Sequence, residues 1–248
     1  MAVGLVEAIR PFAATAQAGD AVTDRAIQAT SSSEQAAGDA TRNRRFACPG
    51  LFRIVPSRDG GICRIKLPRG LVTAAQLRAI AAAAARFGQP TIEATNRSNI
   101  QIRGVKTGQE DALIQILVAA GLGPRDSGAD DVRNVMVSPV AGLDPAALVD
   151  VTPLADAVLA RLESEAAYHA LSPKFSVQID GGEIVARIDH PNDIWLAAMD
   201  AAHFAVGLGG CPGDSDGAVG VIAANRAEAT LFALLDFFLP TIGRTNSA

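Results

Sequence analysis

The sequence predicts an α+β fold, in which one unit of two strand pairs and two helices is followed by a second α+β unit. Hydrophobic residues make up 49% of the 248 residues, which is enough to build a core. Aromatic residues are only 4%, so that core must consist mainly of Ala, Val, Leu and Ile. Strand-length segments of alternating polarity stand beside helix-length segments. A connector rich in Gly and Asp at 121–131 separates the two units.

Residues 1–45 differ in composition from the rest of the chain. They are rich in Ala, Thr, Ser, Gln and Asp, and they include Ser31-Ser32-Ser33. Such a stretch buries too little apolar surface to offset the entropy that is lost on ordering. We therefore expect a flexible N-terminal extension, in which only Val3 to Ala14 could form a short helix.

The first folded unit is expected at 46–122, in the order β-β-α-β-β-α. Strands are predicted at 51–55, 62–67, 91–95 and 99–103. Thr73 is a suitable N-cap for a helix over 74–87, and a second helix is expected from Gly108 to about Ala120. Because side chains alternate along a strand, some should point inward (Ile92, Ala94, Ile100 and Ile102) and others outward (Asn99, Gln101 and Arg103).

The second unit is expected at 131–248. A strand at 134–137 and a helix at 153–165 open it. Two strands, at 174–179 and 183–189, are predicted to form a hairpin about Gly181-Gly182. Further strands are predicted at 194–200, 203–208 and 218–223, with a loop at 209–217 and a final helix at 226–239.

Charge and hydropathy narrow the classes of partner. The net charge is -4 and the pI about 5.4, which argues against nonspecific binding of nucleic acid. A sheet that binds RNA would also need stacking aromatics, whereas the outward strand positions carry Arg, Lys, Asn, Gln and Glu. The sequence contains no uninterrupted run of about 18 apolar residues, so no membrane-spanning helix is predicted. The N-terminus lacks the pattern of a secretory signal, so a cytoplasmic location is expected.

The residues that could bind metal are few and scattered. Cys48, Cys63 and Cys211 contain no CxxC spacing, and three cysteines cannot supply the four ligands that an iron–sulfur cluster usually takes. Buried, inert thiols are the favoured interpretation. The three histidines, at 169, 190 and 203, show no converging pattern, so no metal site is predicted in this chain.

Four polar clusters on strands or turns are candidates for a binding face. Arg64 and Lys66 share one strand face, which taken alone favours a solvated surface. Arg-Asn opens an apolar strand at 133–134, and Lys174 shares a face with Ser176. The fourth cluster is a row of donors of equal parity with almost no carboxylate nearby. This cluster consists of Arg97, Asn99, Gln101 and Arg103. It suits carboxylate binding, because Arg donates bidentate hydrogen bonds to carboxylates.

The order of short motifs supports a family resemblance. The motifs are Cys48-Pro49-Gly50-Leu51, Asp59-Gly60 with Arg64-Ile65-Lys66-Leu67-Pro68, Thr95-Asn96-Arg97, Arg133-Asn134-Val135 and Pro173-Lys174-Phe175. This succession resembles the N-terminal half of the nitrite and sulfite reductases, from about Phe46 to the C-terminus. The opening motif and the segment from Ser138 to Pro145 look most like the precorrin-3B synthases of the same family.

The resemblance implies a ferredoxin-like half-domain of the nitrite/sulfite reductase type, followed by the first half of the family's second α+β domain. It also implies a site where a tetrapyrrole meets an iron–sulfur cluster. Arg97, Arg133 and Lys174 match the family's anion-binding positions and are the expected catalytic residues. With the outward donors, the expected tetrapyrrole contacts are Arg64, Lys66, Asn99, Gln101, Arg103 and Asn134.

The implied activity is oxygen-dependent hydroxylation and lactone formation on precorrin-3A, in aerobic cobalamin biosynthesis. The implied cofactors are a 4Fe-4S cluster and iron or siroheme, but the family's cluster cysteines lie in a C-terminal half that this chain does not match. A C-terminal half or a second subunit is therefore an expected partner, and the electron donor is not indicated. The alternatives are half of a sulfite or nitrite reductase and a noncatalytic tetrapyrrole-binding module. Reductases carry a second basic residue where Ser176 stands here.

Overall fold

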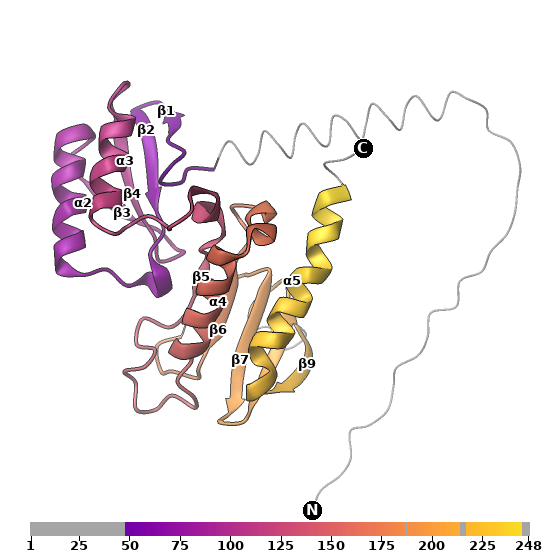
Figure 1. The fold of residues 1–248 in the computed structure, drawn as a ribbon. Coiled ribbons are helices and arrows are strands. Elements are labelled where there is room, and N and C mark those ends of the chain that lie inside the picture. The colour runs from indigo at the N-terminus through magenta and orange to yellow at the C-terminus, as the bar shows by residue number, and fades with distance from the viewer. Residues whose placement is uncertain (1–47, 187, 214–216, 245–248) are drawn as a thin grey trace, which may run out of the picture.

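The computed structural model describes residues 48–186, 188–213 and 217–244, with side chains described as far as residue 239. The expected flexible extension at 1–45 lies outside these residues. The remainder forms two units that lie side by side, each with its own sheet and its own hydrophobic core (Figure 1). In the described part of the chain, no helix is both long and apolar enough to cross a membrane.

The first unit is a four-stranded antiparallel sheet with two helices packed on one face. The strand order is β1-β2-β4-β3, and the predicted chain order β-β-α-β-β-α is confirmed. Its core joins sheet residues such as Ile65 and Ile102 to helix residues such as Ile80 and Leu113. The elements are β1 (Val55–Ser57), β2 (Gly60–Ile65), η1 (Pro68–Gly70), α2 (Ala74–Phe87), β3 (Ile92–Ala94), β4 (Ile100–Val105) and α3 (Glu110–Ala119).

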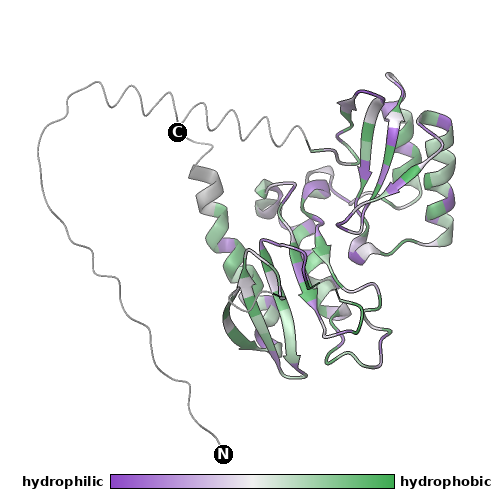
Figure 2. Cartoon of the chain, turned by 180° about the vertical axis from the view of Figure 1, so that it is seen from behind, coloured by the Kyte–Doolittle hydropathy of each residue, from purple (hydrophilic) through white to green (hydrophobic). Residues whose placement is uncertain are grey.

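Helix α2 begins where its local sequence predicts. The Thr73 side chain accepts a hydrogen bond from the Gln76 main-chain N–H, and the Gln76 side chain accepts one from the Thr73 N–H. This reciprocal capping box satisfies two N–H groups that a helix start leaves without partners. Hydrophilic and hydrophobic residues both occur along α2, and its apolar face packs on the sheet (Figure 2).

Three strand expectations in this unit are wrong. The first strand begins at Val55 rather than at 51. Ile92 and Ala94 are exposed, because β3 is a short strand at the edge of the sheet. Asn99, expected to point outward, is buried: its Oδ1 accepts from the Leu67 N–H at 3.1 Å, and its own N–H donates to Thr95 Oγ1 at 3.2 Å.

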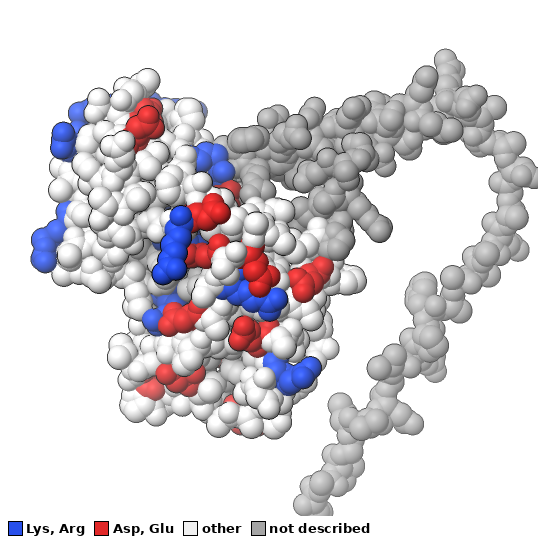
Figure 3. Space-filling model, viewed as in Figure 1, with Lys and Arg blue, Asp and Glu red and all other residues white. Residues whose placement is uncertain are grey.

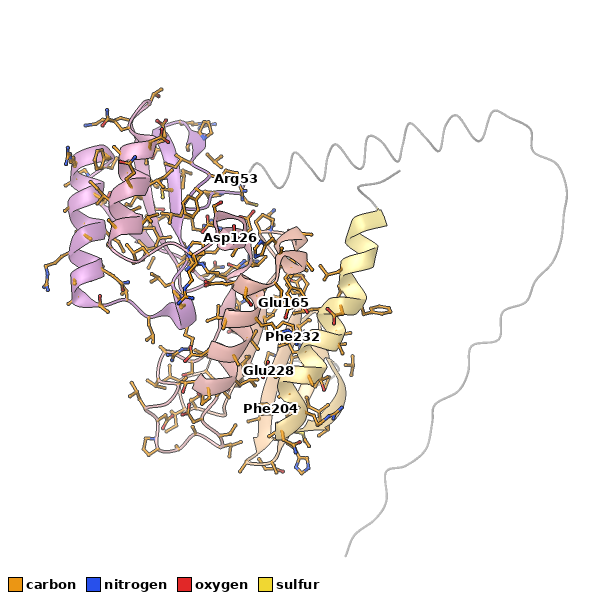
Figure 4. All side chains as sticks on the ribbon, in the orientation of Figure 1. Arg53, Asp126, Glu165, Phe204, Glu228 and Phe232 are labelled. Atoms are coloured by element: carbon orange, nitrogen blue, oxygen red, sulfur yellow. The ribbon has the colours of Figure 1, made fainter. Side chains whose placement is uncertain are left out.

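The second unit is a five-stranded sheet of order β5-β6-β7-β8-β9. Strands β5, β6 and β7 are parallel, and β7, β8 and β9 are antiparallel. Helices α4 and α5 cover one face, and Phe204 of β8 and Phe232 of α5 belong to the shared core (Figure 4). The elements are η2 (Ser127–Val132), β5 (Val135–Met136), α4 (Thr152–Ser164), η3 (Ala166–Ala170), β6 (Val177–Asp180), β7 (Ile194–Asp200), β8 (His203–Leu208), β9 (Ala218–Ala223), η4 (Ala224–Arg226) and α5 (Ala227–Arg244).

The expected hairpin around Gly181-Gly182 is wrong. Strand β6 pairs in parallel with β5 and β7, and the described residues of 183–189 form no strand. All four residues of β6 are buried, since this strand lies inside the sheet between β5 and β7. The segment after Gly181 instead leaves the sheet, and the Gly181 carbonyl accepts from the Leu148 and Val149 N–H groups.

Ion pairs and hydrogen bonds join the two units. The Arg53 guanidinium binds the Asp131 carboxylate through two hydrogen bonds, of 2.6 and 3.0 Å. The Leu51 N–H donates to Asp130 Oδ2 at 2.7 Å. Acidic and basic side chains gather along the boundary between the units in Figure 3, and Figure 4 places Arg53 there. The junction is therefore a defined interface, which fixes how residues of the two units face one another.

Candidate functional site

A basic cavity lies at the junction of the two units. Its volume is about 530 Å³, and Arg64, Arg97 and Lys174 all line it. Arg64 comes from β2, Arg97 from the β3–β4 turn and Lys174 from the segment before β6. No Asp or Glu is among the described lining residues, although the whole chain is acidic. The other lining residues are Cys48, Pro49, Thr95, Asn96 and His190.

The two arginines of this cavity lie close enough to repel each other. Burial lowers the pKa of Arg64, nearby Cys48 opposes this, and the charge of Arg97 lowers it further. With the Gln101 amide turned so that its oxygen faces Arg64, that oxygen accepts from the guanidinium at 2.6 and 2.9 Å. The Gln101 amide thus holds the Arg64 guanidinium in place, but, being neutral, it does not compensate the positive charge of Arg64. An anion bound between Arg64 and Arg97 would relieve the repulsion.

Lys174 is positioned by main-chain contacts of its neighbours. The Asn134 Nδ2 donates to the carbonyls of Pro173 and Phe175, at 2.9 and 3.0 Å. The Lys174 N–H donates to the Ser172 hydroxyl at 3.2 Å. Asn134 itself is buried, so the structure gives this expected tetrapyrrole contact a supporting position behind the cavity.

Lys66 and Arg133 lie inside the junction and do not line the basic cavity. The Lys66 Nζ donates to the Asp131 carbonyl at 2.5 Å, and the lysine is 1% exposed. Arg133 is 3% exposed and donates to the Leu122 carbonyl at 3.2 Å. Arg133 therefore does not line this cavity with Arg97 and Lys174. Its guanidinium lies beside the carboxylates of Asp130 and Glu163, at nitrogen–oxygen distances of 3.7 and 3.8 Å, and its expected catalytic role stays a prediction.

The donor row on β4 divides between different surroundings. Gln101 supports Arg64, whereas Arg103 forms an ion pair with Asp59, with Nε and Oδ2 3.1 Å apart, at the β1–β2 turn. Asn99 holds the main chain at Leu67. Equal parity along a strand does not bring side chains to one cavity, since successive residues of equal parity lie about 7 Å apart.

The cysteines do not form a cluster site. All three are buried, as expected, and burial raises the pKa of the Cys63 thiol to about 12. A cluster needs thiolates, which such burial disfavours. No group of three or more His, Cys, Asp or Glu side chains suited to a metal ion occurs among the described residues. These residues therefore do not fit a 4Fe-4S cluster.

Comparison with known families decides the relationship. The nitrite/sulfite reductase ferredoxin-like half domain matches residues 55–120, and the nitrite and sulphite reductase 4Fe-4S domain matches residues 128–241. The chain belongs to the nitrite/sulfite reductase-like family. The two matches follow the two units of the structure, so the α+β fold with a ferredoxin-like half-domain is confirmed.

Individual members of the family show similar identity levels. A precorrin-3B synthase of Sinorhizobium sp. is 30% identical over 84% of this chain and 45% of its own length. The ferredoxin–nitrite reductase of Synechococcus elongatus is 34% identical over 66% of this chain and 33% of its own. The structure of the Mycobacterium tuberculosis NirA protein superposes with a TM-score of 0.48 at 20% identity, over 60% of this chain and 28% of that one. The chain spans less than half the length of these relatives.

Sequence reasoning did not select several residues of the basic cavity. Thr95 and Asn96 directly precede Arg97 in the sequence, and this adjacency to a predicted site residue was the signal that could have identified them as lining residues. His190 directly follows the segment 183–189 that was expected to be a strand, and nothing in its local pattern indicates that it reaches the junction.

Proposed function

We propose that this chain forms the tetrapyrrole-binding half of a precorrin-3B synthase-like oxidoreductase, in which the basic cavity binds peripheral carboxylates of the substrate. The observation that carries the proposal is the cavity lining, where three cations from both units stand without a carboxylate. A carboxylate is costly to bury without a cationic partner, and a precorrin carries several of them.

The surroundings of Ser176 support the synthase over the reductases. Ser176 is buried, and both its N–H and its hydroxyl donate to Asp193 Oδ2, at 2.8 and 3.3 Å. A reductase would be expected to carry a second basic residue at the position of Ser176. The synthase relative also covers more of this chain than the Synechococcus reductase does. The reductase-type siroheme protein remains the second candidate, favoured by the 34% identity to that reductase.

The residues of this chain bind and orient the substrate. Arg97 and Arg64 would bind carboxylates through paired N–H donors, and Lys174 would add a point charge from the second unit. The family's iron cofactor would supply the redox chemistry when bound. Since the described residues do not fit a cluster, its ligands must come from another half or subunit, as expected from the sequence.

The test is tetrapyrrole affinity, measured by fluorescence titration with uroporphyrin I, a tetrapyrrole polycarboxylate. Arg97→Ala should cost on the order of 2 kcal/mol of binding, which is about 30-fold in Kd. Lys174→Ala should cost about 1 kcal/mol, because Lys174 is exposed and its charge is screened. Arg78→Ala and Lys106→Ala are matched controls, since both side chains are exposed and neither lines the cavity.

Three outcomes would overturn the proposal. If the parent chain does not bind uroporphyrin I, the basic cavity is not a tetrapyrrole site. If the cavity variants bind as the controls do, the binding takes place elsewhere. If siroheme copurifies with the chain and completes a nitrite- or sulfite-reducing complex, the reductase candidate is the correct one.

A further inference from the structure

The edge strands of the two sheets differ in how they are protected against pairing with another strand. An edge presents main-chain N–H and C=O groups without partners, and natural proteins block it by short length, proline, charge or a covering element. Strand β1 has three residues and carries Pro56, and β3 has three residues and carries Glu93. Strand β5 has only two residues, and both are buried. Three of these edges are therefore poor templates for a further strand.

Strand β9, the outer strand of the second sheet, has none of these protections (Figure 1). Its six residues are Ala-Val-Gly-Val-Ile-Ala, with no charge and no proline. In the part of the chain that the structure describes, β9 pairs on one side only, with β8. The side chains of Val219 and Val221 are 64% and 57% exposed. An uncharged, exposed edge of this length is a template for another strand.

The side chains of β9 alternate between the two faces of the sheet. Ile222 packs against the core that α4 and α5 cover, whereas Val221 lies beside Ala205 of β8 on the opposite face. The pairing of β9 with β8 is regular from Gly220 to Ala223, after a register shift nearer the start of the strand. An identical strand in antiparallel orientation offers this edge the same main-chain spacing and the same uncharged apolar side chains, so the edge is complementary to itself.

We propose that β9 pairs antiparallel with β9 of a second copy of this chain, which joins two five-stranded sheets into one. A twofold axis perpendicular to the sheet at Val221 places Val221 opposite Val221, Gly220 opposite Ile222, and Val219 opposite Ala223 of the second copy. The helices of both copies then stay on the same face. A central pair of valines stabilises adjacent strands, whereas an axis at Gly220 would place two glycines there with no side chains to pack.

The dimer is expected to be weak and independent of the ligand. Six residues a side form a small interface, at the low end of the range for specific complexes, so the fraction of dimer should depend strongly on protein concentration. No residue of β9 is among the described residues that line the basic cavity. The inference therefore goes beyond the proposed function and stands or fails separately from it.

Sedimentation velocity of the full chain, from about 1 to about 200 μM, tests the association. The parent should shift from monomer to dimer across this range. Val221→Lys should weaken the dimer at least about tenfold in Kd, because two like charges would lie directly opposite each other at the axis. Met199→Lys is the matched control, since Met199 is 56% exposed on β7 and β8 separates it from the edge. A monomeric parent, or a dimer that Val221→Lys leaves intact, would overturn the inference. Equal weakening by both variants would also overturn it, because that result indicates association through the sheet face.

A cross-link tests the pairing without adding charge. Residues directly opposite in an antiparallel pair have Cα atoms about 4.5–5.5 Å apart, which a disulfide can span. The native cysteines Cys48, Cys63 and Cys211 are buried, so a cysteine placed at an exposed position should be the thiol that reacts. With diamide as the oxidant, Val221→Cys should form an interchain disulfide at least about tenfold faster than Met199→Cys, which is exposed to the same degree. Equal rates for the two variants would overturn the pairing of β9 about Val221.

Discussion

The Arg97 side chain reaches from the first unit into the second, where its Nη1 donates to the main-chain carbonyl of Lys174 at 3.0 Å. One residue of the basic cavity thereby sets the distance to another across the junction. A guanidinium has five N–H donors, so this bond leaves others that can bind an anion. The contact joins the positioning of the two units to the chemistry of the cavity.

Replacing Arg97 with Lys separates charge from geometry. Lysine keeps the positive charge, but one ammonium cannot both reach the Lys174 carbonyl and present a planar fork to a carboxylate. Arg97→Lys should therefore weaken uroporphyrin I binding by about tenfold, the equivalent of 1.4 kcal/mol. Arg78→Lys on the exposed face of α2 is the matched control. Full affinity in Arg97→Lys would show that charge alone is recognised.

Buried Lys66 predicts a pH dependence of stability. Burial lowers its pKa from 10.5 to about 8, and Asp130 and Asp131 oppose the shift only in part. The unfolded chain then holds this proton more tightly than the folded chain. The contribution of Lys66 to the free energy of unfolding should therefore rise with pH between about 8 and 10.5, by at most roughly 3 kcal/mol.

Urea unfolding of the parent and Lys66→Met at pH 7 and pH 9.5 measures this effect. The parent should gain stability relative to Lys66→Met at the higher pH. Lys106→Met, which removes an exposed lysine, should show no such relative gain. A parent-to-variant difference that stays constant with pH would mean that the Lys66 pKa is not lowered by folding.

Gly207 is required by the Trp195 side chain of the neighbouring strand. A Cβ at Gly207 would lie 1.9 Å from the indole ring, and Trp195 is 1% exposed with its Nε1 bonded to the Gly209 carbonyl. Gly207→Ala should cost about 3 kcal/mol or more in unfolding free energy, measured with urea. Gly220→Ala on adjacent β9 meets nothing within 4 Å and should change stability by less than about 1 kcal/mol. Equal effects of the two substitutions would contradict this packing.

Local patterns predicted the elements whose signals lie within a few residues. Helix α2, with its Thr73 cap, and strands β7, β8 and β9 have the residue ranges expected from the sequence. A capping box, a turn and an alternating strand are formed by neighbours in the chain. The predicted hairpin at Gly181 is wrong for the opposite reason, since β6 pairs in parallel with β5 and β7 and not with the segment that directly follows its turn.

By itself, the sequence determined the α+β class, the order of elements in the first unit, the family and the basic residues from which a carboxylate site is built. Only the tertiary structure decided which of those residues meet. Arg64, Arg97 and Lys174 line one cavity, whereas Lys66 and Arg133 neutralise the interior of the junction. The physical reason is that the sequence specifies the chemistry of a side chain and, through strand alternation, the face of the sheet on which it lies. The residues that it contacts depend on how the two sheets pack against each other.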